Sequence, residues 1–207
     1  MHALLLCNGE TPSRTLSRRA AAKADLVVAA DGGANIALRC GITPHVIIGD
    51  LDSISPSTRR RFSSARVIQV SRQDNTDLEK ALDYLALRKA KQVTILGATG
   101  KRIDFTLGNL AVIWNYTADF SIIVLADQWR AFPVTTDLTL KARKGTTVSI
   151  IPFGLCSGVT LKGLKYPLHD ATMHVGSIGV SNVVVKSHFS VHVTRGNVLV
   201  IVFDKKL

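Results

Sequence analysis

The segment DLVVAADGGANIALRCGITPHVIIGDLDS (25–53) decides the fold that we expect for this chain. Residues 25–33 predict a buried strand ending in glycines, residues 34–41 a short helix that Gly41 stops, and residues 45–53 a strand ending in acids. Continuous apolar strands that alternate with amphipathic helices are typical of a parallel sheet covered on both faces. The segment therefore indicates an α/β fold.

The same alternation continues on both sides of this segment. Further strands are predicted at 2–9, 65–71, 92–100 and 120–128, and further helices at 12–24, 76–90 and 102–116. In the helix at 76–90, Thr76 and Glu79 form a capping box, and Leu78, Ala81, Leu82 and Leu85 share one face.

The pattern changes near residues 131–137, after which helical periodicity is absent. In the stretch 188–194, apolar and polar residues alternate, and residues 195–197 form a turn. We therefore expect an α/β catalytic domain with a mostly parallel sheet at 1–132. A small antiparallel β-sandwich domain is expected to follow at 133–207.

Composition excludes several classes of protein. The 207 residues are 46% hydrophobic, which is ample for a core, and no apolar run approaches the roughly 18–20 residues of a membrane span. The net charge is 26 − 15 = +11, but the excess is spread along the chain and no nucleic-acid motif occurs, so we expect no nucleic-acid partner. Three scattered cysteines argue against a disulfide framework and favour a reducing, cytoplasmic location.

Six aspartates lie beside turns or strand ends, where ligands of parallel sheets bind. They are Asp31, Asp50, Asp52, Asp74, Asp77 and Asp104. In an extended chain, Asp50 and Asp52 would point to the same side with Cα atoms roughly 6.5 Å apart, so they could share one or two hard cations such as Mg²⁺. The alternative is a turn that caps the next helix.

Two further loops have a functional and a purely structural explanation. In QDNTD (73–77), Thr76 can cap a helix and Asp77 can complement its dipole, but two carboxylates exceed what a cap requires. In GATGKRID (97–104), the glycines allow backbone N–H groups to approach an anion, and Arg102 can bind phosphate oxygens. An ordinary tight turn is the alternative here. Neither a P-loop nor a G-x-G-x-x-G motif is present.

Taken together, these motifs resemble the thiamine pyrophosphokinase family in order and spacing. The matching stretches are DGGAN (31–35), GDLDS (49–53), QDNTDLEKAL (73–82), GATGKRIDFTLGNL (97–110), GLKYPL (163–168) and SIGVSN (177–182). The resemblance covers nearly the whole chain. It implies Mg²⁺-dependent transfer of the pyrophosphoryl group of ATP to the hydroxyl of thiamine, which gives thiamine diphosphate and AMP. It also implies a homodimer with thiamine bound at the interface.

The resemblance assigns roles by motif position. The implied magnesium ligands are Asp50, Asp52 and Asp77, and the implied catalytic residues are these three with Arg102 and Asp104. The implied ATP-binding residues are Asp31, Gly32, Gly97, Thr99, Arg102 and Thr106. The implied thiamine-binding residues are Gln73, Asp74, Tyr166, Ser181 and Asn182.

Two positions depart from the family pattern. Phe105 stands where the family usually has His, and Tyr166 stands where it usually has Trp. These departures keep one alternative open, a related pyrophosphokinase that acts on a pterin-like alcohol. A second alternative is a nucleotide- or nucleic-acid-binding module without catalysis. Release of AMP from Mg-ATP with and without thiamine distinguishes the three.

Overall fold

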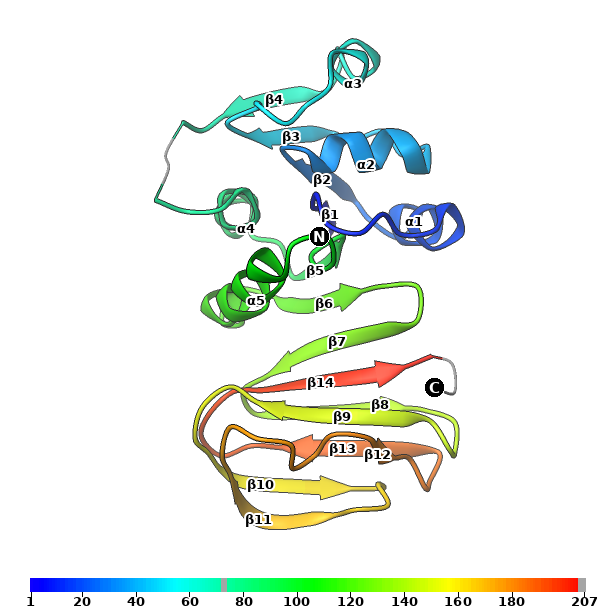
Figure 1. The fold of residues 1–207 in the computed structure, drawn as a ribbon, viewed down its shortest axis with the longest axis vertical. Coiled ribbons are helices and arrows are strands. Elements are labelled where there is room, and N and C mark those ends of the chain that lie inside the picture. Colours follow the sequence, from blue (N-terminus) through cyan, green and yellow to red (C-terminus); the bar gives the residue numbers. More distant parts are fainter. Residues whose placement is uncertain (72–73, 205–207) are drawn as a thin grey trace. The chain divides into compact units, whose positions relative to one another are not determined.

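The computed structural model describes residues 1–71 and 74–204, and the chain divides into two compact units (Figure 1). The first unit runs from Met1 to Asp127 and the second begins at Gln128. The boundary expected from the sequence, between residues 132 and 133, falls within the first strand of the second unit, Trp129–Val134.

The first unit contains a six-stranded parallel sheet, as expected from its continuous apolar strands. The strand order is β6-β5-β1-β2-β3-β4, and every adjacent pair is parallel. The strands are β1 (His2–Leu6), β2 (Leu26–Ala30), β3 (Val46–Gly49), β4 (Arg66–Gln69), β5 (Gln92–Leu96) and β6 (Ser121–Leu125). Their carboxyl ends therefore meet at one edge.

Five α-helices and one 3₁₀-helix accompany the sheet among the described residues. They are α1 (Arg14–Ala21), α2 (Gly33–Cys40), α3 (Pro56–Arg61), α4 (Asp77–Leu87), α5 (Ile103–Val112) and η1 (Ile113–Tyr116). Helix α2 packs against β1 and β2, whereas α4 packs against β2 and β3. The predicted capping box of Thr76 and Glu79 begins α4, and the predicted apolar face of α4 is buried.

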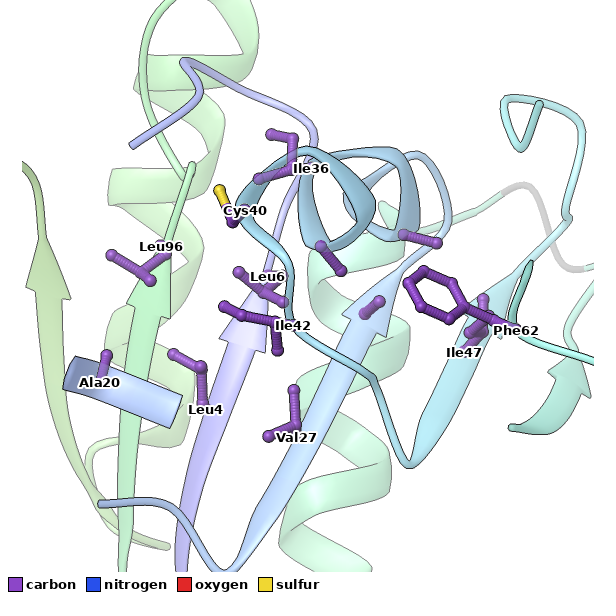
Figure 2. Close-up of a cluster of buried hydrophobic side chains, with 13 residues drawn as sticks. Leu4, Leu6, Ala20, Val27, Ile36, Cys40, Ile42, Ile47, Phe62 and Leu96 are labelled. Atoms are coloured by element: carbon purple, nitrogen blue, oxygen red, sulfur yellow. The ribbon is translucent and has the colours of Figure 1, made fainter. Parts of the chain in front are cut away.

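A hydrophobic cluster fixes α2 against the sheet (Figure 2). Leu4 and Leu6 of β1, Val27 of β2 and Ile36 of α2 are buried in it. Alternation along β1 directs Ala3 and Leu5, which are also fully buried, to the opposite face. Both faces of the sheet are therefore covered, and the strand ends keep fixed positions.

The second unit is entirely of strands and turns in its described part, and its strands form two antiparallel groups. One group has the order β12-β9-β14-β7 and the other β11-β10-β13-β8. The strands are β7 (Trp129–Val134), β8 (Asp137–Lys141), β9 (Thr147–Pro152), β10 (Cys156–Lys162), β11 (Leu168–Met173), β12 (Asn182–Val183), β13 (His188–His192) and β14 (Val198–Phe203). Both groups contribute buried side chains, such as Val200 and Phe189. The predicted fold class is confirmed.

Helix α5 differs from the other helices in its exposure. The sequence places Ile103, Leu107, Leu110 and Trp114 on one apolar stripe. Ile103 is 72% and Leu107 62% exposed, so the start of this stripe leaves apolar surface uncovered on the chain. None of the described helices combines the length and the apolar character that crossing a membrane would require.

Candidate functional site

A cleft of about 320 Å³ lies at the carboxyl ends of the parallel strands in the first unit. Segments that follow β1, β2 and β5 line it, together with the first turns of α4 and α5. The lining includes Cys7, Asn8, Asp31, Gly32, Ser53, Thr76, Asp77, Gly97, Lys101, Arg102 and Phe105. The cleft therefore occupies the position at which sheets of this kind bind ligands.

Three carboxylates meet at this edge of the sheet. Asp31 directly follows β2, Asp50 directly follows β3, and Asp77 begins α4. One side-chain oxygen from each lies within 4.8 Å of the other two. Gly49 makes this approach possible, because a Cβ at this position would lie 2.8 Å from the Asp31 Cβ and 3.1 Å from the Asp77 Oδ1. We call Asp31, Asp50 and Asp77 the acidic group.

Asp31 is the most buried member of the acidic group. It is only 3% exposed, and its Oδ1 has no hydrogen-bond partner among the described residues. Burial raises the pKa of Asp31, the nearby charges of Asp77 and Asp50 raise it further, and the Ser53 hydroxyl and Gly32 N–H lower it in part. Its φ of 41° lies in the left-handed region, where strain is common at functional sites.

This arrangement fits a divalent metal ion. Three hard carboxylate oxygens are the donors that Mg²⁺ takes from a protein, and the remaining positions go to water and substrate phosphates. A buried oxygen without a partner, such as Oδ1 of Asp31, is a group that a bound cation would satisfy. The acidic group can therefore hold a metal ion and a phosphate chain beside it.

Asp52 lies outside the acidic group. The extended conformation expected for residues 50–52 is wrong, because β3 ends at Gly49 and Leu51 has a φ of 72°. Asp52 is exposed, and its Oδ1 accepts a hydrogen bond of 2.9 Å from the Ser53 hydroxyl. The structure thus brings Asp31 to Asp50 and Asp77, and it directs Asp52 to solvent.

The glycine-rich turn at 97–102 forms another wall of the cleft. Gly97 has a φ of 68°, and a Cβ there would lie 2.6 Å from the Cys7 carbonyl oxygen, so the turn fits closely against the end of β1. The Thr106 hydroxyl closes the turn, since it accepts from the Gly100 N–H and donates to the Arg102 carbonyl. The carbonyl of Thr99 accepts a hydrogen bond from the N–H of Glu10.

Two helices point uncapped N-termini at this cleft. Ser13, Ser55 and Thr76 cap α1, α3 and α4 with side-chain hydrogen bonds. By contrast, Gly32 before α2 and Arg102 before α5 make no such bond. Both residues line the cleft. The Gly32 N–H is bonded to the Asp31 carboxylate and the Phe105 N–H to the Asp104 carboxylate, so the remaining N–H groups of these first turns are the ones available for an anion.

Arg102 and Asp104 form an exposed pair at the rim of the cleft. The guanidinium donates two hydrogen bonds to the carboxylate, one of them 3.1 Å long from Nε, and it lies 4.5 Å from the ring centre of Phe105. Hydrogen bonding from Arg102 lowers the pKa of Asp104. Asp104 is therefore a weak base in this conformation, and Arg102 would have to leave it to bind a phosphate with the same two N–H groups.

The residues expected on the thiamine side fall in both units. Tyr166, Ser181 and Asn182 lie together in the second unit: Asn182 is buried, accepts from the Tyr166 N–H and donates to the Tyr166 carbonyl. Ser181 precedes it with a φ of 56°. Asp74 is exposed in the first unit. Gln73 lies outside the described residues.

Sequence reasoning missed three residues of this region: Cys7, Asn8 and Lys80. Cys7 and Asn8 directly follow β1, and their place at a strand end was the available signal. Burial, with a further contribution from the charge of Asp77, raises the pKa of the Cys7 thiol to about 12, so this thiol is neutral. Lys80 lies one helical turn after Asp77 on the buried face of α4, and its Nζ donates to the Asp77 Oδ1 at 2.9 Å.

Comparison with protein families gives two matches in succession along the chain. The family model described as "Thiamin pyrophosphokinase, catalytic domain" matches residues 17–125, and the model described as "Thiamin pyrophosphokinase, vitamin B1 binding domain" matches residues 135–198. A curated thiamine pyrophosphokinase of Bacillus subtilis is 30% identical over 184 residues, which are 85% of this chain and 86% of that protein. Thiamine pyrophosphokinase 1 of Arabidopsis thaliana is 31% identical, and the match covers 92% of this chain and 82% of that protein.

Solved structures with the same fold include two with these names. The crystal structure of thiamine pyrophosphokinase from Bacillus subtilis has a TM-score of 0.84, 24% identity and full coverage of both chains. The thiamin pyrophosphokinase of Candida albicans has a TM-score of 0.86 and 17% identity, and the match covers 98% of this chain and 88% of that chain. At these identities, the structural likeness is a statement about the fold alone.

Proposed function

This chain belongs to the thiamin pyrophosphokinase family, and we propose that it transfers the pyrophosphoryl group of ATP to the hydroxyl of thiamine, giving thiamine diphosphate and AMP. The observation that supports this most is the pair of family matches, which cover a catalytic and a vitamin-binding part in the expected order. The cleft with its acidic group lies within the part that the catalytic model matches.

We propose that the acidic group holds Mg²⁺, with Asp50 and Asp77 as expected from the sequence and Asp31 as a third ligand. When bound, the metal supplies positive charge that neutralises phosphate oxygens. Asp52 is exposed two residues after Asp50, and we retain it as a candidate ligand once substrate is present. The protein thus supplies charge and position, and the attacking oxygen belongs to the substrate.

The phosphate chain of ATP would bind along the part of the cleft that Gly32 and the glycine-rich turn at 97–102 line. The uncapped N-termini of α2 and α5, at Gly32 and Arg102, offer backbone N–H groups. Gly97, Thr99 and Thr106 shape the turn between them. After leaving Asp104, the guanidinium of Arg102 can bind the transferred group with two parallel hydrogen bonds.

For thiamine, we propose Tyr166, Ser181 and Asn182 together with Gln73 and Asp74. Asn182 uses its amide to hold the Tyr166 backbone, which leaves the Tyr166 side chain 58% exposed for a cationic ring. Asp74 adds a negative charge that suits the same ring. Gln73 follows from the family resemblance alone.

We propose that the enzyme is a homodimer and that thiamine binds at the interface. Large apolar side chains stand exposed on α5 and on the loop before β12, among them Ile103, Leu107, Val175 and Ile178. Apolar surface of this kind marks contact sites. If each site uses residues from two copies, mixing Asp50→Asn protomers with Tyr166→Ala protomers restores activity that neither variant has alone. If the two variants exchange subunits and the mixture is still inactive, the result would contradict a site shared between two copies.

We also propose a cytoplasmic location. The three cysteines, Cys7, Cys40 and Cys156, are all buried and unpaired. Free thiols in a chain of this size are typical of a reducing compartment.

The test of the function is the release of AMP from ATP by the purified chain with Mg²⁺. We expect AMP and thiamine diphosphate in equal amounts when thiamine is present, and neither product without thiamine. AMP release that depends on a pterin-like alcohol in place of thiamine would establish the related pyrophosphokinase. No AMP with either alcohol, together with retained nucleotide binding, would establish a binding module.

A further inference from the structure

Lys80 is a buried cation beside the acidic group. Its side chain is 3% exposed, although burying an ammonium group is costly unless the group is paired. The partner is Asp77, whose Oδ1 accepts a hydrogen bond from Nζ at 2.9 Å. Lys80 lies one helical turn after Asp77, so α4 carries both members of the pair.

The charges at this point can be counted. Asp31, Asp50 and Asp77 contribute three negative charges when ionised, and Lys80 contributes one positive charge. The remainder is −2, which one divalent cation balances. Without Lys80, the same three carboxylates would carry −3, a charge that attracts a second cation.

The position of Lys80, like its charge, favours one metal ion over two at the acidic group. In enzymes with two metal ions, the ions lie about 3.5–4 Å apart and act together on one phosphate. Asp77 has two carboxylate oxygens, and a second ion beside the acidic group would have to share them with the first ion. Oδ1, the oxygen of Asp77 on the Gly49 side, already accepts from the Lys80 ammonium at 2.9 Å, so Lys80 leaves Asp77 less free to serve two ions.

We propose that Lys80 takes the place of a second metal ion: it balances one charge of the acidic group and occupies one oxygen of Asp77, so that the acidic group binds a single divalent cation. This inference rests on the proposed function in taking the acidic group as the metal site. It assigns a positioning role to a residue of α4 that is directed at Asp77 and has no direct role in the reaction.

Binding of Mn²⁺ to the metal-free, nucleotide-free protein tests this, with Mn²⁺ as a paramagnetic substitute for Mg²⁺ in electron paramagnetic resonance. We expect the wild-type chain to bind one Mn²⁺, and we expect Asp50→Asn to abolish this binding. Lys80→Met keeps a side chain of similar length without the charge, and we expect it to bind Mn²⁺ at least tenfold more tightly or to take up a second ion. Lys80→Arg keeps the charge and should bind as the wild type does.

Lys101→Met is the matched control. It also removes one positive charge from the cleft, but the Nζ of Lys101 donates to the Asn8 carbonyl at 2.9 Å and not to Asp77. We expect a change in Mn²⁺ affinity of less than twofold. A merely structural role of Lys80 would leave Mn²⁺ binding unchanged or weaken it in Lys80→Met, and either result would overturn the inference.

The wild type alone also provides a decisive measurement, which matters if Lys80→Met does not fold. Two Mn²⁺ ions of similar affinity, both lost in Asp50→Asn, would overturn the role of Lys80 and leave the proposed function intact. Absence of Mn²⁺ binding would overturn both this inference and the metal site on which it rests. AMP release measured on the same preparation separates these failures from a failure of the proposed activity.

Discussion

The acidic group and the glycine-rich turn both contribute residues to one cleft but are built in opposite ways. The acidic group joins the ends of two buried strands to the start of a helix, and its Asp31 oxygen has no partner within the described chain. In the turn, Arg102 and Asp104 are exposed and already paired with each other. The fold itself therefore forms the side that we propose for the metal ion, whereas the side that we propose for phosphate would exchange internal contacts for substrate contacts. Substitutions should act differently on the two sides.

The largest effect is expected from Asp50→Asn, because the fold offers no replacement for a fixed metal ligand. We expect kcat to fall at least 100-fold, about 2.7 kcal/mol of transition-state stabilisation, with an unchanged melting temperature. A steady-state assay of AMP release and a thermal melt measure both quantities. Near-normal turnover in folded protein would contradict the metal scheme.

Asp52→Asn makes this comparison sharper. Asp52 is exposed and outside the acidic group, so a loss smaller than that of Asp50→Asn is expected if the loop keeps its conformation. A loss of 100-fold or more would mean that substrate draws Asp52 to the metal. That result would show that residues 51–53, like the glycine-rich turn, change their contacts when substrate binds.

In the glycine-rich turn, Arg102→Gln should reduce activity less than Asp50→Asn does. The guanidinium is exposed, so its removal should not change the melting temperature, but two hydrogen bonds to the phosphate chain are lost. We expect KM for ATP to rise about tenfold, or roughly 1.4 kcal/mol. Arg102→Lys retains the charge but cannot form two parallel hydrogen bonds, so its KM for ATP should lie between those of the wild type and Arg102→Gln. An unchanged KM in Arg102→Gln would remove Arg102 from the ATP site.

The same contrast explains what the sequence could and could not predict. Six aspartates were predicted to lie along one edge because parallel strands end there, and three of them, Asp31, Asp50 and Asp77, do meet. The sequence did not single out these three, because the expected metal ligands were Asp50, Asp52 and Asp77. The place of Asp52 was missed because it depends on one dihedral angle, the positive φ of Leu51, which turns the chain after β3. Local sequence gave no signal for that turn, since leucine rarely adopts this conformation.

Lys80 shows a second limit of the sequence. It lies at helical spacing on the buried face of α4, where a charged residue indicates a partner, but its partner becomes evident only once Asp77 is placed at the start of the helix. Likewise, periodicity predicted an apolar stripe of Ile103, Leu107, Leu110 and Trp114, but none of these residues is buried on the chain, and Trp114 lies beyond the end of α5. Periodicity defines a face of an element, and the tertiary structure decides what covers that face.

Asp31→Asn tests whether the acidic group destabilises the metal-free protein. The folded pKa of Asp31 is raised above the unfolded value, so the unfolded chain loses this proton first as pH rises. The free energy of unfolding therefore falls through that range, and the loss is complete above the folded pKa. Asn has no such penalty, and we expect Asp31→Asn to raise the free energy of unfolding at pH 7 by about 1 kcal/mol.

Urea unfolding with a chelator present measures this difference, which should shrink as pH is lowered toward the ordinary aspartate pKa. Added Mg²⁺ should stabilise the wild type and not the variant, because only the wild type retains the complete acidic group. A variant less stable than the wild type at pH 7 would show that Asp31 has a structural role that outweighs the cost of its buried charge.

The smallest effect is expected at Tyr166, which resembles Arg102 in being exposed and already engaged. The Lys165 ammonium lies 5.3 Å from the centre of the Tyr166 ring, so a cationic thiamine ring bound on Tyr166, as we propose, would displace it. Tryptophan offers a stronger π face, and we expect Tyr166→Trp to tighten thiamine binding two- to fivefold, about 0.5–1 kcal/mol, with kcat unchanged. Lys165→Met removes the competing cation from the same ring and should tighten binding by a similar factor. Calorimetric titration with thiamine would decide the point: if neither variant changes the affinity, Tyr166 does not contact the cationic ring.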